Sequence, residues 1–120
     1  QYVQAAGYIE HNPRLRDGID ALRDALAADA PPALLDCRTP GEHEVASIEA
    51  ALLIPMNELP ARVAELAELK DRPVVVHCHL GGRSLKVTQF LRGQGFTDVK
   101  SLAGGIDAWS RSIDPDVPRY

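Results

Sequence analysis

The segment 78–84, Cys-His-Leu-Gly-Gly-Arg-Ser, holds the residues whose types and spacing could do chemistry. A cysteine thiolate is a strong nucleophile, and an arginine supplies a rigid cationic fork for an anionic substrate. The glycines let the backbone adopt conformations that other residues rarely take, which a tight loop around a sulfur atom requires. We therefore expect Cys78 to be a nucleophile and Arg83 to orient an anionic substrate.

The elements on either side of this segment place it at a typical binding position. Residues 74–77 are a β-branched run that predicts a central buried strand, and a helix is predicted from Ser84 to about Leu91. Ligands of open α/β sheets bind beyond the carboxyl ends of the strands. The N–H groups and dipole of a helix N-terminus lower the pKa of a nearby cysteine. We expect Cys78 to be largely ionised at neutral pH and Ser84 to cap the helix.

Strand and helix patterns alternate along the rest of the chain. Helices are predicted at 15 to about 29, after Thr39 and after Asn57, and a last one begins at Gly104-Gly105. Further strands are predicted at 33–37, 51–54 and 98–102. This order favours an α/β fold, a parallel sheet with helices on both faces. Residues 1–14 show no clear period and are expected to be an N-terminal arm before one domain at 15–120.

Composition excludes several classes of protein. The chain has 120 residues, is 45% hydrophobic and 25% charged, and carries a net charge of -4. It is long enough for one domain with a real core. No apolar run is long enough to cross a membrane. The acidic balance argues against nucleic-acid binding, and two cysteines are typical of a reducing, cytoplasmic protein. Within residues 70–92, five Lys or Arg and one Asp predict a cationic face at the site.

Both histidines beside Cys78 suggest a metal site at first sight. Successive strand residues point to opposite sides, so His77, Cys78 and His79 cannot easily converge on one ion, and no metal is expected. We expect His77 to be a hydrogen-bonded core residue and His79, at the loop rim, to meet substrate or tune the thiolate. Cys37 has two interpretations, a resolving thiol or a packed core residue, and its apolar strand favours the core.

The polar residues after the first strand are expected to be mainly structural. Thr39, Pro40 and Glu42 form a capping-box pattern. Asp36 and Arg38 are expected to hold loops by charge-assisted hydrogen bonds, with Arg38 also able to reach the mouth of the site. Trp109 is interpreted as a core residue.

The sequence resembles a rhodanese-like sulfurtransferase domain over about residues 15–120. Three stretches carry the resemblance: 34–42, with the Asp-x-Arg pattern and a following Glu; the 78–84 loop; and 102–109, with Gly-Gly-x-x-x-Trp. The resemblance implies a five-stranded parallel sheet and sulfur transfer by double displacement through a Cys78 persulfide, without a cofactor. The expected substrate-binding residues are Arg83, His79, Leu80, Gly81, Gly82, Ser84 and Arg38.

Residues 46–55 depart from the Gly-His-Ile-x-Gly-Ala pattern of many single-domain relatives. With the tail at 113–120, they are similar to the rhodanese domain that follows ubiquitin-activating-like adenylyltransferases. This resemblance implies thiosulfate or a protein persulfide as donor. It also implies a ubiquitin-like sulfur-carrier protein as acceptor, in molybdopterin or thiolated-cofactor synthesis.

Two other functions remain open from the residues alone. Cysteine phosphatases and arsenate reductases also use a Cys-to-Arg anion loop, but a longer one than the four residues between Cys78 and Arg83. A second alternative is a non-catalytic docking module, and the presence of both Cys78 and Arg83 argues against it.

Overall fold

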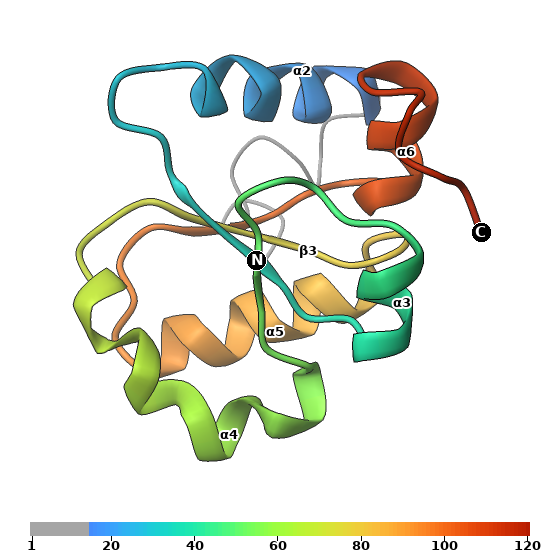
Figure 1. Ribbon diagram of the computed structural model, residues 1–120. Helices are drawn as coiled ribbons and strands as arrows, with labels where there is room; N and C mark the ends of the chain where they lie inside the picture. Colours follow the sequence, from blue (N-terminus) through green and yellow to red (C-terminus); the bar gives the residue numbers. More distant parts are fainter. Residues whose placement is uncertain (1–14) are drawn as a thin grey trace.

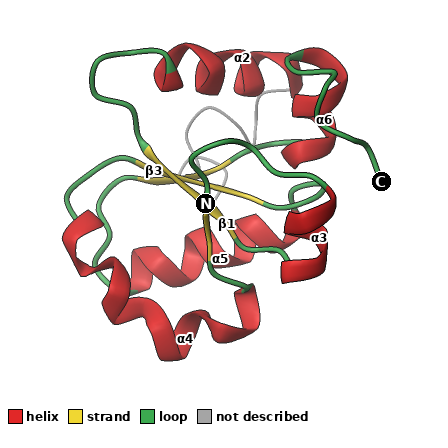
Figure 2. Cartoon of the chain, viewed as in Figure 1, coloured by secondary structure: helices red, strands yellow, loops and turns green. Residues whose placement is uncertain are grey.

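A parallel sheet forms the middle layer of the protein (Figures 1 and 2). The structure is a computed structural model that describes residues 15–120. Its strands are β1 (Ala33–Asp36), β2 (Leu52–Leu53), β3 (Val74–His77) and β4 (Val99–Ser101), in the order β2-β1-β3-β4. All neighbouring pairs are parallel, so the carboxyl ends of β1 and β3 lie side by side, with Asp36 opposite His77.

Helices cover both faces of the sheet (Figure 1). One face packs against α2 (Leu15–Leu26) and α6 (Gly105–Ser112). The other packs against α5 (Gly82–Gly93) and a segment made of η1 (Met56–Glu58), α4 (Leu59–Arg62) and η2 (Val63–Leu69). The short helix α3 (Pro40–Val45) follows β1 at the end of the sheet where the carboxyl ends of the strands lie.

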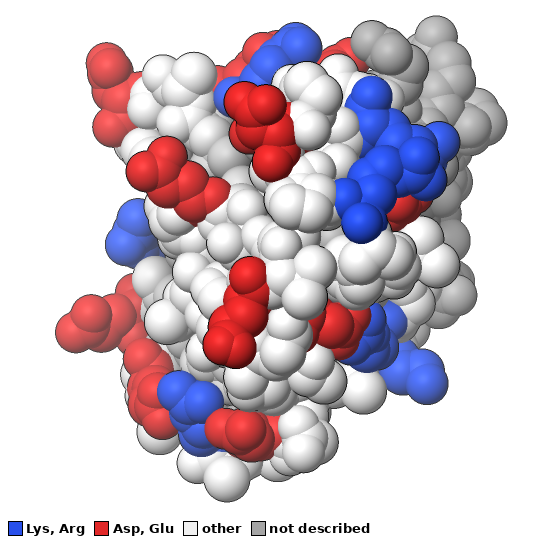
Figure 3. Space-filling view, turned by 45° about the vertical axis from the view of Figure 1, so that its right-hand side comes forward, with Lys and Arg blue, Asp and Glu red and all other residues white. Residues whose placement is uncertain are grey.

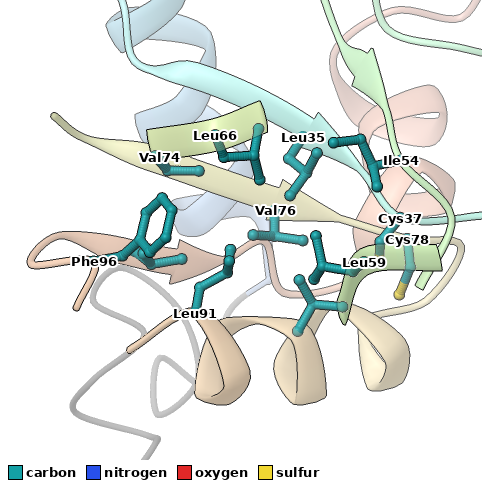
Figure 4. Close-up of a cluster of buried hydrophobic side chains, with 12 residues drawn as sticks. Leu35, Cys37, Ile54, Leu59, Leu66, Val74, Val76, Cys78, Leu91 and Phe96 are labelled. Atoms are coloured by element: carbon teal, nitrogen blue, oxygen red, sulfur yellow. The ribbon is translucent and has the colours of Figure 1, made fainter. Parts of the chain in front are cut away.

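Successive side chains of each strand point to opposite faces of the sheet, and this divides the core into two clusters. Val74 and Val76 point to the α5 side, where they pack with Leu91 and Phe96 (Figure 4), and Val75 points to the α2 and α6 side. Every residue of β3 is buried, as expected for a central parallel strand. Cys78 comes two residues after Val76 and its side chain points to the same face of the sheet, so it lies on the α5 side.

The predicted α/β class, with a parallel sheet and helices on both faces, is confirmed. The resemblance implies five strands, whereas the described residues form four. Residues 15–120 contain four apolar runs bounded by turn residues, and each of them forms a strand. The expected N-terminal arm, residues 1–14, lies outside the described residues.

The helix predicted after Asn57 is the largest difference in secondary structure. The chain there forms a single α-helical turn between two 3-10 segments. Leu59 and Val63 have α-helical spacing, but Val63, Leu66 and Leu69 are three residues apart, which matches the 3-10 period. α2 also ends earlier than predicted, at Leu26. In residues 15–120 no helix has the length and apolarity needed to span a membrane.

Candidate active site

Cys78 is the first residue of a tight loop, residues 78–81, between β3 and α5. Its Sγ accepts hydrogen bonds from the backbone N–H of Gly81 at 3.1 Å and of Ser84 at 3.4 Å. The residue is only 1% exposed, so these amides rather than bulk water surround the sulfur. Two N–H donors at a helix N-terminus favour negative charge on the atom they face. The loop is therefore built to hold an anionic sulfur.

Gly81 makes this loop geometry possible. Its φ of 123° lies in a region that residues with a side chain rarely adopt, and it occupies the N-cap position of α5. Gly82 has no positive φ and faces open space, so the expectation that both glycines are needed for the backbone holds for Gly81 alone.

Ser84 does not cap α5, contrary to expectation. The helix begins at Gly82, so the Ser84 side chain lies inside the first turn, where its hydroxyl donates to the carbonyl of Gly81 at 3.1 Å. The same oxygen lies 3.5 Å from Cys78 Sγ and 2.8 Å from the hydroxyl of Ser101 on β4. Sequence reasoning missed Ser101; a buried serine at the end of a strand parallel to β3 was the available signal.

The N-terminus of α6 supports the base of the loop. The backbone N–H of Ile106 donates to the carbonyl of Cys78 at 2.9 Å, and that of Asp107 donates to the carbonyl of His79 at 3.1 Å. Gly105 has a φ of 56°, and a Cβ atom there would contact the oxygen of Cys78. The Gly-Gly pair at 104–105 therefore lets the helix approach the backbone of the nucleophile.

Arg83 forms a two-point ion pair with Glu42 of α3. Its Nη1 and Nη2 lie 2.7 and 2.9 Å from the two carboxylate oxygens. The guanidinium lowers the pKa of Glu42 well below its usual range, and the carboxylate in turn raises the pKa of Arg83. The predicted capping box is confirmed, since Glu42 also accepts from the N–H of Thr39. Sequence reasoning therefore found one of Glu42's roles and missed its contact with Arg83.

Tyr120 joins this pair to a buried arginine. Its hydroxyl donates to Glu42 at 2.8 Å and accepts from Arg38 at 2.8 Å, while its ring stacks on His79 with centroids 4.1 Å apart. No pattern in the tail singles out Tyr120, because its partners come from two distant segments, residues 38–42 and the loop that contains His79. His79 lies at the rim as expected, and Leu80 beside it is 63% exposed.

Arg38 is fully buried and holds the ends of two loops together. Its N–H groups donate to both oxygens of Asp36, at 2.8 and 2.6 Å, and to the carbonyls of Ala46 and Glu42 as well as to Tyr120. The expected loop-holding role is confirmed. These bonds use every N–H of the guanidinium, so Arg38 has no donor left for a substrate at the mouth.

His77 lies behind the loop, on the opposite side of β3 from the sulfur. Burial lowers the pKa of His77 to about 4, so the ring is neutral at neutral pH. Burial raises the pKa of Asp36, but the hydrogen bonds from Arg38 outweigh it and bring the value to about 2. His77 is a core residue as expected. It is not fully hydrogen-bonded, because its Nε2 has no partner among the described residues and lies 4.0 Å from Asp36.

Cys37 and Trp109 are both core residues, as predicted. Cys37 is 1% exposed, and its thiol donates to the carbonyl of His77. Burial, together with the nearby Cys78 and Asp36, raises the pKa of Cys37 to about 12. Trp109 packs in the cluster beneath α2.

No three His, Cys, Asp or Glu side chains within residues 15–120 are grouped to hold a metal ion.

Comparison with known proteins identifies the fold family. The Rhodanese-like domain family matches residues 19–112. The chain belongs to the rhodanese-like domain family. It is 41% identical over 101 residues to the adenylyltransferase and sulfurtransferase MOCS3-1 of Zea mays, covering 79% of this chain and 22% of that protein. It is 40% identical over 98 residues to a sulfurtransferase of Allochromatium vinosum, covering 82% of this chain and 90% of that protein.

A solved structure agrees with this assignment. A rhodanese-like domain protein from Staphylococcus aureus superimposes with a TM-score of 0.70 at 30% identity, covering 85% of this chain and 94% of that one. The rhodanese-like domain thus accounts for most of the described chain, whereas the maize protein is several times longer.

Charge around the site of this rhodanese-like domain is more balanced than the sequence predicted. Lys70 and Arg72 precede β3, and Arg92 lies at the far end of α5, so the fold carries these cations away from Cys78. Arg83 is paired with Glu42, which comes from a different part of the sequence. In Figure 3, acidic side chains lie mainly on the left and in the centre of the view, and basic side chains lie mainly on its right. Three of the five cations counted within residues 70–92 therefore lie away from the loop and Arg83 is paired, which leaves Lys86 on α5 and a smaller positive excess than the sequence predicted.

Proposed function

We propose that this domain is a sulfurtransferase that carries sulfane sulfur as a persulfide on Cys78. The observation that supports this function best is the pair of backbone N–H groups, from Gly81 and Ser84, directed at Cys78 Sγ. Donors fixed in a water-poor site stabilise charge without reorganising during the reaction. In the proposed reaction Cys78 is the only residue that forms and breaks covalent bonds, so the proposal includes no cofactor.

The proposed reaction is a double displacement. With thiosulfate, the Cys78 thiolate attacks the outer sulfur; a sulfur–sulfur bond forms, and sulfite leaves with the electron pair of the broken bond. With an organic persulfide, the same attack releases the donor's thiolate. In the second half, an acceptor nucleophile attacks the outer sulfur of the Cys78 persulfide and regenerates the thiolate. Sulfur and charge balance in each half without an oxidant or reductant.

A small sulfur-carrier protein is the proposed physiological acceptor. The similarity to the maize adenylyltransferase and sulfurtransferase supports this choice, since that protein unites the two named activities in one chain. The exposed Leu80 and the stacked pair of His79 and Tyr120 lie at the rim of the loop, where an acceptor chain would have to approach. The proposed path is therefore from thiosulfate or a persulfide donor, through Cys78, to the end of a carrier protein.

The function is tested by the intact mass of the purified protein before and after thiosulfate, and again after cyanide. We expect a gain of one sulfur atom that cyanide then removes as thiocyanate. The Cys78→Ser variant, run in parallel, should never show the gain, because a serine hydroxyl cannot carry sulfane sulfur.

Failure of every donor to add sulfur would contradict the proposal. The donors tried should include thiosulfate, a thiosulfonate and an organic persulfide. A gain of equal size in the Cys78→Ser variant would also contradict it, since the sulfur would then reside elsewhere.

A further inference from the structure

The cation nearest the reactive sulfur along the loop is already occupied. Both Nη atoms of Arg83 face the two oxygens of Glu42, and the Arg83 side chain is 32% exposed against 21% for Glu42. A two-point pair of this kind is geometrically matched and charge-assisted. A donor that needed the front of the guanidinium would have to break it or share it with a carboxylate.

Glu42 is fixed from several sides, so it cannot easily swing away. Its Oε2 also accepts from the hydroxyl of Tyr120, and its Oε1 accepts from the N–H of Thr39. Tyr120 is in turn held by Arg38, whose charge is balanced by Asp36. The carboxylate therefore remains beside Arg83 as a fixed negative charge at the mouth of the site.

By pairing with Arg83, the fixed carboxylate removes an attraction that would grow with the negative charge of the donor. Thiosulfate carries two negative charges at neutral pH, whereas a thiosulfonate or an organic persulfide presents one at the reacting group. Coulomb attraction at a partly buried site is weakly screened, so a dianionic donor loses more than a singly charged one when Arg83 is held by Glu42.

We propose that Glu42 determines donor specificity: by pairing with Arg83 it disfavours dianionic thiosulfate and favours singly charged sulfane-sulfur donors such as organic persulfides. This inference rests on the proposed sulfur transfer and deepens it. It assigns Glu42, interpreted from the sequence as a helix-capping residue, a second role through Arg83.

The test compares two small donors of nearly the same shape. Methanethiosulfonate differs from thiosulfate by a methyl group in place of one charged oxygen. Cys78 attacks its terminal sulfur, a sulfur–sulfur bond forms, and methanesulfinate leaves with the electron pair. The second-order rate constant for sulfur loading is measured for each donor by rapid quenching and intact mass, so that the acceptor step does not contribute.

The decisive variant is Glu42→Gln, which removes the charge but keeps an oxygen for Tyr120 and suits the capping box. We expect thiosulfate loading to rise about tenfold and methanethiosulfonate loading only about threefold. Because sulfite and methanesulfinate differ as leaving groups, the informative quantity is the change caused by the substitution. In an Arg83→Gln background, the gain with thiosulfate should be much smaller, since no guanidinium is released.

Glu44→Gln is the matched control. Glu44 lies on the same helix and is exposed, so the same loss of charge there should change loading by less than about twofold. Equal gains for both donors in Glu42→Gln, or an equal gain in Glu44→Gln, would overturn the specificity role. Failure of wild type to load from either donor would instead overturn the proposed sulfur transfer. Urea denaturation of each variant verifies that it is folded.

Discussion

Two buried cysteines on the same side of the sheet have different hydrogen-bond partners. Both Cys37 and Cys78 are 1% exposed, yet Cys78 accepts two backbone N–H bonds, whereas the thiol of Cys37 donates to a carbonyl. Hydrogen bonds to sulfur favour the thiolate, and a hydrogen bond from sulfur favours the thiol. Residue type alone could not distinguish the two; the two backbone N–H groups directed at Cys78 Sγ do, since each thiol also has an oxygen acceptor at 3.5 Å.

We predict that Cys37 does not react in the folded protein. With a pKa of about 12, only about one Cys37 in ten thousand is ionised near pH 8, and the thiolate is the reactive form. In the Cys78→Ser variant, where Cys37 is the remaining cysteine, iodoacetamide should add no mass to the native protein. After urea unfolding it should add one carbamidomethyl group. Rapid labelling of the native variant would contradict the core interpretation and support a resolving thiol.

At the scale of elements, α6 acts as the support of the catalytic loop rather than as a part of it. Its first two N–H groups after Gly105 bind the carbonyls of Cys78 and His79, and they fix the backbone from which the sulfur extends. This contact needs a residue without a Cβ atom. At Gly105 a Cβ would clash with the backbone oxygens of Cys78 and His79.

We therefore expect Gly105→Ala to damage stability and sulfur loading together. A positive φ and the forced separation of α6 from the loop should cost about 3 kcal/mol of the free energy of unfolding. Urea denaturation measures that loss, and intact mass after thiosulfate measures loading. Gly93→Ala is the control: a Cβ at Gly93 meets nothing within 4 Å, so stability should change by less than about 1 kcal/mol. Equal behaviour of the two variants would contradict this account of α6.

The elements were more predictable than the contacts between them. Strands β1 and β3, the capping box of α3 and the strand–loop–helix around Cys78 follow from local patterns of apolar and turn residues. The pairing of Arg83 with Glu42, and of both with Tyr120, joins residues far apart in the sequence. No local pattern records such contacts. The charge count over residues 70–92 overestimated the positive charge for the same reason, because folding brings Glu42, from outside that segment, to Arg83.

At the scale of the whole molecule, a chain of polar residues joins the site to the centre of the sheet. Glu42 and Tyr120 lie at the mouth, Arg38 and Asp36 lie beneath them, and His77 lies behind Asp36 in the core. Burial disfavours a positive charge on His77 most strongly; Asp36 offsets this only in part, and Arg38 adds to it. The folded protein therefore keeps His77 neutral, which links the stability of the whole domain to pH.

We predict that stability falls as the pH is lowered from about 6.5 to about 4. The pKa of His77 is lowered to about 4 in the folded protein, while an unfolded histidine titrates near 6.5. Between these values the unfolded chain binds a proton that the folded chain does not, so acid favours unfolding, by about 3 kcal/mol across the window. Below it, the Asp36 pKa of about 2 adds a second loss between about pH 4 and pH 2, as the unfolded chain takes up a proton first.

Urea denaturation at a series of pH values, with His77→Asn beside wild type, separates the two parts of this curve. The variant should be less stable at pH 7, because it leaves a smaller polar side chain in the core, but its stability should change little between about pH 6.5 and about pH 4.5. His79→Asn removes a partly exposed histidine instead and should keep the wild-type slope. If His77→Asn retained the full slope above pH 4.5, another group would have to be the source of the acid sensitivity, and the buried neutral histidine would not be coupled to folding.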